Sequence, residues 1–355
     1  MKRIAVIPGD GIGPEVIAEA VRTIEVASTL YGFEVSLTTF DWGAEKYLST
    51  GETLPEGALE MLAAEYNAIL AGAFGDPRVP DNKHAADILL GLRSGLDLYI
   101  NLRPIKLIDE RLCPLKGRKP ADVDFVVFRE NTEGMYVFVG GNFKKNTADE
   151  IAVQEEINTR KGVERIIIAA FDYAREHRRK RVTMSDKSNV LTYGHDLWQR
   201  TFKEVASRYP DIEANHLYVD VLTMWMALDP GRFDVIVTNN LFGDIVTDLG
   251  AALQGGLGMA ASGNIHPGRV SLFEPVHGSA PAFAGKNVSN PIAAILSAAM
   301  MLDYLGFKEA SAGIEQAVEA AVRAGETTVD IGGPLSTTEA GEAIRRRLDE
   351  QQQSR

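Results

Sequence analysis

The sequence contains a single cysteine, Cys113, and this scarcity excludes two classes of protein. One thiol cannot form an intramolecular disulfide, and it cannot supply the several thiolates of a cysteine-based zinc site. Disulfide scaffolds and zinc-ribbon proteins are therefore excluded. We expect Cys113, which stands between Leu112 and Pro114, to pack in a loop rather than to act as a nucleophile.

Long apolar runs and an excess of positive charge are also lacking. No stretch approaches the roughly 20 apolar residues that a membrane-spanning helix needs, and no apolar signal region follows Met1. Lysine and arginine total 37 against 49 aspartates and glutamates, which gives a net charge of −12. Such an acidic chain argues against nucleic-acid binding. We expect a cytoplasmic protein with no membrane or nucleic-acid partner.

Strand-like and helix-like patterns alternate along all 355 residues, which predicts an α/β fold. Strands are predicted at residues 4–7, 34–40, 68–71, 125–128, 181–184, 217–221 and 233–238. Helices are predicted at residues 14–30, 55–64, 85–96, 162–176, 196–208, 290–304, 313–324 and 336–351. Residues 136–141 are β-rich and punctuated by glycine, and we expect them to form an arm outside the core sheet.

Two aspartates, Asp244 and Asp248, follow the strand predicted at residues 233–238. On a helix, positions four apart share one face, so both carboxylates would point the same way. Two hard oxygen ligands at the carboxyl end of a strand suit Mg²⁺ or Mn²⁺. The alternative is a helix N-terminus that carries acidic residues because the helix dipole favours them.

Three arginines and a lysine lie close to apolar segments. The guanidinium groups of Arg93, Arg103 and Arg129 could together clamp a dicarboxylic acid, although any one of them could equally form a surface ion pair. Lys187 follows the strand predicted at residues 181–184. A lysine there can act as a base if desolvation lowers its pKa.

A glycine-rich turn at residues 9–13 follows the first strand and opens a helix. The spacing fails the dinucleotide-binding fingerprint, because Pro14 stands where the third glycine should be. The glycines still allow a ligand to approach the backbone closely, and a tight strand-to-helix turn is the alternative.

Together these segments resemble the β-decarboxylating dehydrogenases, the family of isopropylmalate, isocitrate, homoisocitrate and tartrate/D-malate dehydrogenases. Each matching stretch alone is a weak signal, but six of them in family order across nearly the whole chain are specific. They are IPGDGIGPEV from Ile7, NLRP from Asn101, RENTEG from Arg129, DKSNV from Asp186, NLFGDIVTDL from Asn240 and FEPVHGSAP from Phe273.

The resemblance implies an isopropylmalate dehydrogenase-like two-domain α/β fold with a mixed, mainly parallel sheet. A discontinuous cofactor-side domain would comprise residues 1–101 and 256–355. A central domain, residues 102–255, would carry the metal site, the β-arm and the dimer interface. The active site would lie between the domains of a homodimer, with Lys187 and Asp220 acting in the site of the partner.

The implied reaction is the metal- and nicotinamide-dependent oxidative decarboxylation of a 3-carboxy-2-hydroxy acid. Lys187 would take the hydroxyl proton and Tyr136 would return a proton to C3. The remaining residues would bind substrate and metal. The substrate ligands would be Arg93, Arg103, Arg129 and Asp220, and the Mg²⁺ or Mn²⁺ ligands Asp220, Asp244 and Asp248.

The resemblance also assigns a cofactor-binding set. It comprises Ile12, Glu274, His277, Gly278, Ser279, Ala280, Ala282 and Asn290. Ala282 departs from the family pattern, because NAD-using members usually place an aspartate there to bind the adenosine ribose. No basic residue stands at Ala282, Phe283 or Ser289 to attract a 2′-phosphate, so we favour NAD and leave NADP open.

Substrate choice rests on Leu89 and Leu90, which precede Arg93 by one helical turn. A leucine pair would contact an isopropyl group, worth ~2–3 kcal/mol when buried. This favours 3-isopropylmalate, which yields 2-oxoisocaproate in leucine biosynthesis. D-malate or tartrate is the alternative, because residues 85–87 lack the glutamate common in isopropylmalate enzymes; isocitrate or homoisocitrate comes next. A regulatory, non-catalytic paralogue is disfavoured, because Tyr136, Lys187 and all three metal-binding aspartates are present.

Overall fold

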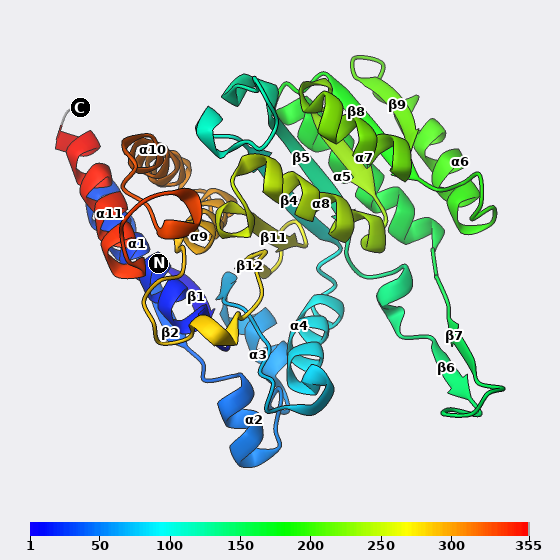
Figure 1. Ribbon diagram of the computed structural model, residues 1–355, viewed down its shortest axis with the longest axis horizontal. Coiled ribbons are helices and arrows are strands. Elements are labelled where there is room, and N and C mark those ends of the chain that lie inside the picture. The colour runs from blue at the N-terminus through cyan, green and yellow to red at the C-terminus, as the bar shows by residue number, and fades with distance from the viewer. Residues whose placement is uncertain (354–355) are drawn as a thin grey trace. The chain divides into compact units, whose positions relative to one another are not determined.

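The computed structural model describes residues 1–353, and the chain folds into two compact units (Figure 1). The first comprises Met1–Leu98, Lys106–Pro120 and residues 251–353; the second comprises Tyr99–Ile105 and Ala121–Gly250. The segment Lys106–Pro120 thus belongs to the first unit, whereas the sequence analysis expected it in the central domain. It packs with the first unit because Ile108 is buried in that unit's core and Arg111 donates to a backbone carbonyl of the same unit, that of Ile331 (3.1 Å).

The first unit contributes five sheet strands, in the order β2-β1-β3-β12-β11. Its strands are β1 (Lys2–Ile7), β2 (Val35–Thr39), β3 (Ala68–Ala71), β11 (Ala261–Ile265) and β12 (Ser271–Pro275). Its helices are α1 (Gly13–Tyr31), α2 (Ala44–Thr50), α3 (Ala58–Glu65), α4 (Lys83–Gly95), α9 (Ile292–Tyr304), α10 (Lys308–Ala324) and α11 (Thr337–Gln353). β1, β2, β3 and β12 pair in parallel, and β11 pairs antiparallel with β12.

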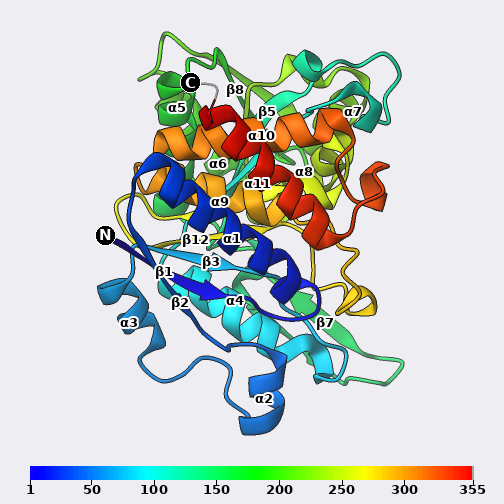
Figure 2. The same ribbon diagram turned by 90° about the vertical axis from the view of Figure 1, so that its left-hand side faces the viewer.

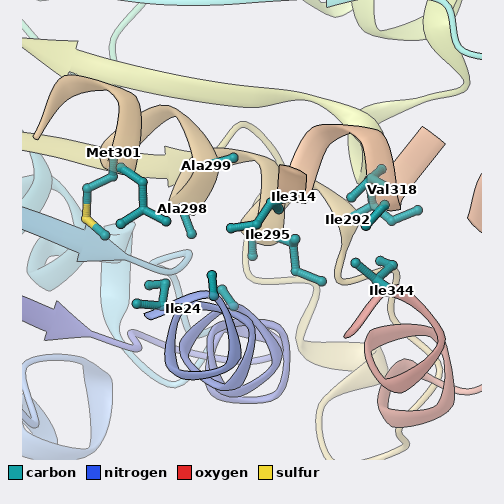
Figure 3. Packing of buried hydrophobic residues seen from close by; sticks show 14 of the residues in the cluster. Ile24, Ile292, Ile295, Ala298, Ala299, Met301, Ile314, Val318 and Ile344 are labelled. Carbon is teal, nitrogen blue, oxygen red and sulfur yellow. The ribbon is translucent and has the colours of Figure 1, made fainter. Parts of the chain in front are cut away.

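Four helices, α1, α9, α10 and α11, pack together in the first unit and bury the larger of its two apolar clusters (Figure 2). Figure 3 shows Ile24 of α1, Ile295 of α9, Ile314 of α10 and Ile344 of α11 in one buried cluster, with Ile295 and Ile314 between Ile24 and Ile344. Each of these side chains is fully buried, and each such burial is worth roughly 1.5–3 kcal/mol. Ile4 of β1 and Leu70 of β3 belong to the same cluster, so the sheet packs against this helical layer.

The second unit contains strands in the order β4-β5-β10-β8-β9. They are β4 (Ile100–Lys106), β5 (Asp124–Glu130), β8 (Arg181–Asp186), β9 (Glu213–Tyr218) and β10 (Val235–Thr238). The helices are α5 (Arg160–Glu176), α6 (Gly194–Ala206), α7 (Val219–Leu228) and α8 (Asn240–Gln254). β6 (Gly140–Phe143) and β7 (Ile151–Gln154) pair antiparallel as an exposed arm (Figure 1).

The register of this second sheet gathers strand ends that carry polar residues. Thr238 lies between Arg129 of β5 and Ser185 of β8, and Asp186 lies beside Tyr218 of β9. Because these strands run parallel, their carboxyl ends meet at one edge, where α/β proteins bind ligands.

Two sequence expectations for the second unit need correction. Residues 217–221 were expected to form a strand, but β9 ends at Tyr218 and α7 begins at Val219, which places Asp220 in the first turn of a helix. A short apolar run does not distinguish strand from helix by its periodicity. The arm predicted at residues 136–141 begins later, at Gly140, and its second strand, β7, was not predicted.

Within residues 1–353, no helix combines the length and apolar character that crossing a membrane requires.

Candidate active site

Asp244, in the first turns of α8, is the point on which three predicted site residues converge. Its Oδ1 accepts hydrogen bonds from Nη1 of Arg129 at 2.6 Å and, more weakly, from Nη2 of Arg103 at 3.4 Å. The phenol of Tyr136 donates to Oδ2 at 3.0 Å. Strands β4 and β5 and the helical turn Met135–Val137 thus bring two guanidinium groups and a phenol to one carboxylate.

The two arginines are held by partners that the sequence analysis did not identify. Arg129, only 2 % exposed, donates from Nε to the backbone carbonyl and the side-chain oxygen of Asn240 (2.9 and 3.0 Å). Arg103 donates to Oδ1 of Asn101 and to Oγ1 of Thr247, both at 2.6 Å. These contacts fix the guanidinium planes before any ligand arrives. The signal for Asn101 and Asn240 was present, because each opens a matching motif.

Asp248 lies one turn after Asp244 on α8. Burial and then the neighbouring charge of Asp244 raise the pKa of Asp248 above its usual value. Two carboxylates that repel each other on one helix face can serve as oxygen ligands of a divalent cation, whose charge would offset the repulsion. Among residues 1–353, however, no three His, Cys, Asp or Glu side chains gather closely enough to hold a metal. Asp220 therefore does not complete the predicted ligand set within one chain.

Lys187 and Asp220 form a separate pair. The ammonium of Lys187 donates to Oδ1 of Asp220 at 2.5 Å, and it holds the pKa of that carboxyl below its usual value. The side chains are 28 % and 61 % exposed. The desolvation that would favour Lys187 as a base is thus not supplied by its own subunit.

In the first unit, Arg93 forms an ion pair with Glu274. Nη2 of Arg93 donates to Oε1 of Glu274 at 2.9 Å, and both side chains are nearly buried. The sequence analysis assigned these two residues to substrate and to cofactor respectively. Leu89 and Leu90 are half-buried, whereas Ile88 of the same helix is fully buried in the core. Leu89, Leu90 and Arg93 therefore do not lie on the face of α4 that packs against the core.

The glycine-rich turn packs directly on the loop that the sequence analysis assigned to the cofactor. The amide of Ile12 donates to the carbonyl of Ser279 at 2.8 Å. Gly11 has φ +59°, and a Cβ there would lie 2.0 Å from the same carbonyl oxygen. Only glycine allows this approach. The turn and the loop therefore form one surface of the first unit.

A buried hydrogen bond not foreseen from the sequence anchors that turn. His84, fully buried at the start of α4, contacts Oδ2 of Asp10 through Nε2 at 2.7 Å. The carboxylate of Asp10 also accepts the amides of Ala44 and Gly75 (2.6 and 2.8 Å). The turn is thereby tied to the helix that carries Leu89, Leu90 and Arg93.

His277 offers an unused nitrogen on the cofactor loop. Its Nδ1 contacts the carbonyl of Gly278 at 3.0 Å, while its buried Nε2 has no partner among the described residues. Burial lowers the pKa of His277, so the ring is neutral near pH 7 and Nε2 is an acceptor. An orphaned acceptor fits a ligand that brings a hydrogen-bond donor. The side-chain oxygen of Asn290 instead accepts the amide of Ile292, the first residue of α9, at 3.0 Å.

The family described as isocitrate/isopropylmalate dehydrogenase matches residues 3–344. The chain belongs to this family. It is 47 % identical over 351 residues to the 3-isopropylmalate dehydrogenase of Thermobifida fusca, covering 98 % of each chain. It is 49 % identical over 339 residues to that of Nocardia farcinica, covering 94 % of this chain and 99 % of the relative.

Solved structures give the same picture. The isocitrate dehydrogenase of Methylococcus capsulatus matches with a TM-score of 0.88 and 39 % identity, over 98 % of this chain and 99 % of that one. The TT0538 protein of Thermus thermophilus matches with a TM-score of 0.86 and 36 % identity, over 99 % and 70 %. The predicted family and α/β fold class are confirmed. Membership implies a dehydrogenase that uses a nicotinamide cofactor and a divalent metal.

Proposed function

We propose that this protein oxidatively decarboxylates 3-isopropylmalate to 2-oxoisocaproate, a step of leucine biosynthesis, with NAD and Mg²⁺ or Mn²⁺. The observation that carries the proposal is the convergence of Arg103, Arg129 and Tyr136 on Asp244. It occurs in a chain that is 47 % identical to a 3-isopropylmalate dehydrogenase over nearly its whole length. A cytoplasmic location remains a prediction.

The arginines are suited to hold the two carboxylates of the substrate. Arg103 and Arg129 already engage a carboxylate, that of Asp244, and bidentate guanidinium groups can exchange one carboxylate for another. Arg93 is assigned to the same substrate by the family resemblance. Its Nε is buried and has no hydrogen-bond partner among residues 1–353, so it retains a donor for an incoming carboxylate. Leu89 and Leu90 would contact the isopropyl group.

The chemistry needs one base and one acid from the chain. When bound, a nicotinamide accepts the hydride from C2, and a divalent cation polarises the oxygens of the hydroxy acid. Lys187 takes the C2 hydroxyl proton, and the 2-ketone that results lies β to the C3 carboxylate, which leaves as CO₂. Tyr136 then donates its phenolic proton to C3. Asp220, Asp244 and Asp248 are the residues that would hold the cation.

We further infer that a second copy of the chain covers the face that carries Lys187 and Asp220. Asp220, Met224 and Leu228 are spaced at i, i+4 and i+8 on α7, so they share one face, and both apolar members are about half exposed. Val190 and Tyr193, just after Lys187, are 64 % and 93 % exposed. Such patches mark protein–protein contacts.

The exposed arm supports the same inference. Four large apolar side chains of β6 and β7, or next to them, are at least half exposed: Phe138, Phe143, Ile151 and Val153. In a symmetric dimer the same patch is used by both copies. Lys187 and Asp220 would then serve the site of the partner, where Asp220 joins that subunit's Asp244 and Asp248.

The substrate assignment is tested by initial rates of reduced-cofactor formation with Mg²⁺. 3-Isopropylmalate, D-malate, tartrate and isocitrate are each assayed with NAD and with NADP. We expect kcat/KM for 3-isopropylmalate to exceed that for D-malate by about a hundredfold, as expected for a buried isopropyl group. In the Leu89→Ala/Leu90→Ala variant the advantage should shrink while D-malate turnover stays.

A preference for D-malate or tartrate in wild type would contradict the substrate assignment and leave the mechanism intact. Absence of metal-dependent turnover with every hydroxy acid would favour the non-catalytic alternative.

Ala282→Asp tests the cofactor assignment. Position 282 is exposed in the loop after His277, and an aspartate there would accept hydrogen bonds from ribose hydroxyls and repel a 2′-phosphate. We expect the ratio of kcat/KM for NAD to that for NADP to rise at least about tenfold. Ala284→Asp, on the same exposed loop, is the matched control and should leave the ratio near that of wild type. Equal effects of the two substitutions would show that position 282 does not face the ribose.

A further inference from the structure

His195, a residue to which the sequence analysis gave no role, lies directly behind Lys187. It sits in the first turn of α6 and is fully buried. The backbone amide of Lys187 donates to Nδ1 of His195 at 2.7 Å. Because Nδ1 accepts a hydrogen bond, the neutral ring carries its proton on Nε2. His195 therefore presents an acceptor to Lys187 and a donor on its opposite side.

The opposite side faces Glu156. Nε2 of His195 lies 3.1 Å from Oε1 of Glu156. Burial raises the pKa of Glu156, but hydrogen bonds from His195, Asn158 and Asn239 outweigh it, and the net pKa lies below the usual value. The carboxylate is therefore ionised and accepts the imidazole N–H. This fixes the tautomer of His195 that Lys187 requires.

Asn239 extends the network to the acidic helix. Its Nδ2 donates to Oε1 of Glu156 at 3.1 Å, and its Oδ1 accepts the amide of Phe242 at 2.9 Å. The second contact satisfies a backbone donor at the start of α8. The same three side chains thus hold the backbone at Lys187 and the start of the helix that carries Asp244.

We infer that His195, oriented by Glu156, is a positioning residue for Lys187. A buried, neutral imidazole with both nitrogens engaged has no part in proton transfer, so its contribution is to set the course of the backbone from which the Lys187 side chain departs. Small misplacements of a catalytic group have large effects on rate. The catalytic consequence rests on the proposed role of Lys187 as the base.

Two substitutions of His195 separate its two contacts. In His195→Asn the amide oxygen can occupy the place of Nδ1, which keeps the acceptor for Lys187 and loses Glu156. In His195→Gln the amide nitrogen can occupy the place of Nε2, which keeps Glu156 and leaves no acceptor at Lys187. We expect His195→Asn to keep kcat within about threefold of wild type and His195→Gln to lose about ten- to a hundredfold. KM for the hydroxy acid should change little in either.

Trp198→Phe is the matched control on the same helix. Trp198 is buried and donates from Nε1 to Oδ1 of Asn158 at 2.9 Å, so its loss disturbs α6 and the segment beside Glu156 without touching Lys187. We expect a lower melting temperature and a nearly unchanged kcat. Equal losses of kcat in His195→Asn and His195→Gln, or a loss in Trp198→Phe as large as in His195→Gln, would overturn the inference.

Hydrogen exchange of the Lys187 amide gives a readout that needs no activity. Exchange should be faster in His195→Gln than in His195→Asn, because only the latter keeps an acceptor. If wild type turns over no hydroxy acid, the proposed function fails, while this order of exchange rates still decides whether His195 positions Lys187. Equal exchange rates would refute the positioning role whatever the activity.

Discussion

Replacing Lys187 by alanine is expected to lower kcat about a thousandfold, because general-base catalysis by a positioned side chain typically contributes 10²–10⁴-fold. The fold should survive. The Lys187 side chain is 28 % exposed and its ion pair with Asp220 is largely solvated, so the pair adds little stability. The measurement is stopped-flow formation of reduced nicotinamide with saturating substrate and Mg²⁺. Sedimentation velocity and thermal unfolding accompany it.

Lys203→Ala is the matched control. Lys203 is an exposed lysine of the same unit, on α6, and its removal should leave kcat near that of wild type. A Lys187→Ala enzyme that retained more than about a tenth of wild-type turnover would be incompatible with Lys187 as the essential base.

Mixing two inactive variants should restore activity if the sites are shared between subunits. Lys187→Ala removes the base, and Asp244→Asn removes a carboxylate from the metal-binding helix. In a mixed dimer, one site would combine the intact Asp244 of one subunit with the intact Lys187 of the other. Random reassociation makes about half of the dimers mixed, and one of the two sites in each mixed dimer is complete. About a quarter of wild-type activity should therefore return. The assay follows activity after the variants are dissociated and reassociated together.

The control for this experiment pairs Lys187→Ala with Asp220→Asn. Both residues would be delivered by the same subunit to the same partner site, so no combination of these two chains yields a complete site. Activity should stay absent in that mixture. No recovery in the Lys187→Ala and Asp244→Asn mixture would mean that each subunit builds its site alone. Recovery in the control would mean that Lys187 and Asp220 of one site come from different subunits.

The sequence predicted best those features that depend on local pattern. Alternating apolar runs gave the α/β class, and the helix start at Asn240 with an acid pair one turn apart is present as α8. Arg129 was placed at a strand end, and the parallel register with β10 brings it to Asp244. The roles of these residues in substrate and metal binding remain predictions.

The remaining features depend on contacts between segments far apart in the chain. Arg93 and Glu274 are separated by 181 positions, and neither sequence motif predicts the hydrogen bond between their side chains. His195 and Glu156 belong to no motif that the sequence analysis identified, and only the fold brings their side chains into contact. The sequence analysis wrongly placed Asp220 on a strand. Tertiary packing, not periodicity, decides whether residues 219–228 form a helix.

Both oxygens of Asp244 already accept hydrogen bonds, Oδ1 from Arg129 and Oδ2 from Tyr136, so a cation that binds Asp244 competes with these donors for its negative charge. In the proposed mechanism, a substrate carboxylate that engages Arg129 would free an oxygen of Asp244 for the metal. Binding of one ligand would thus raise the affinity for the other, and thermodynamic reciprocity would require the two enhancements to be equal. Hydroxy acid and cation would then load as a cooperative pair, so neither binds at full strength until the other has arrived.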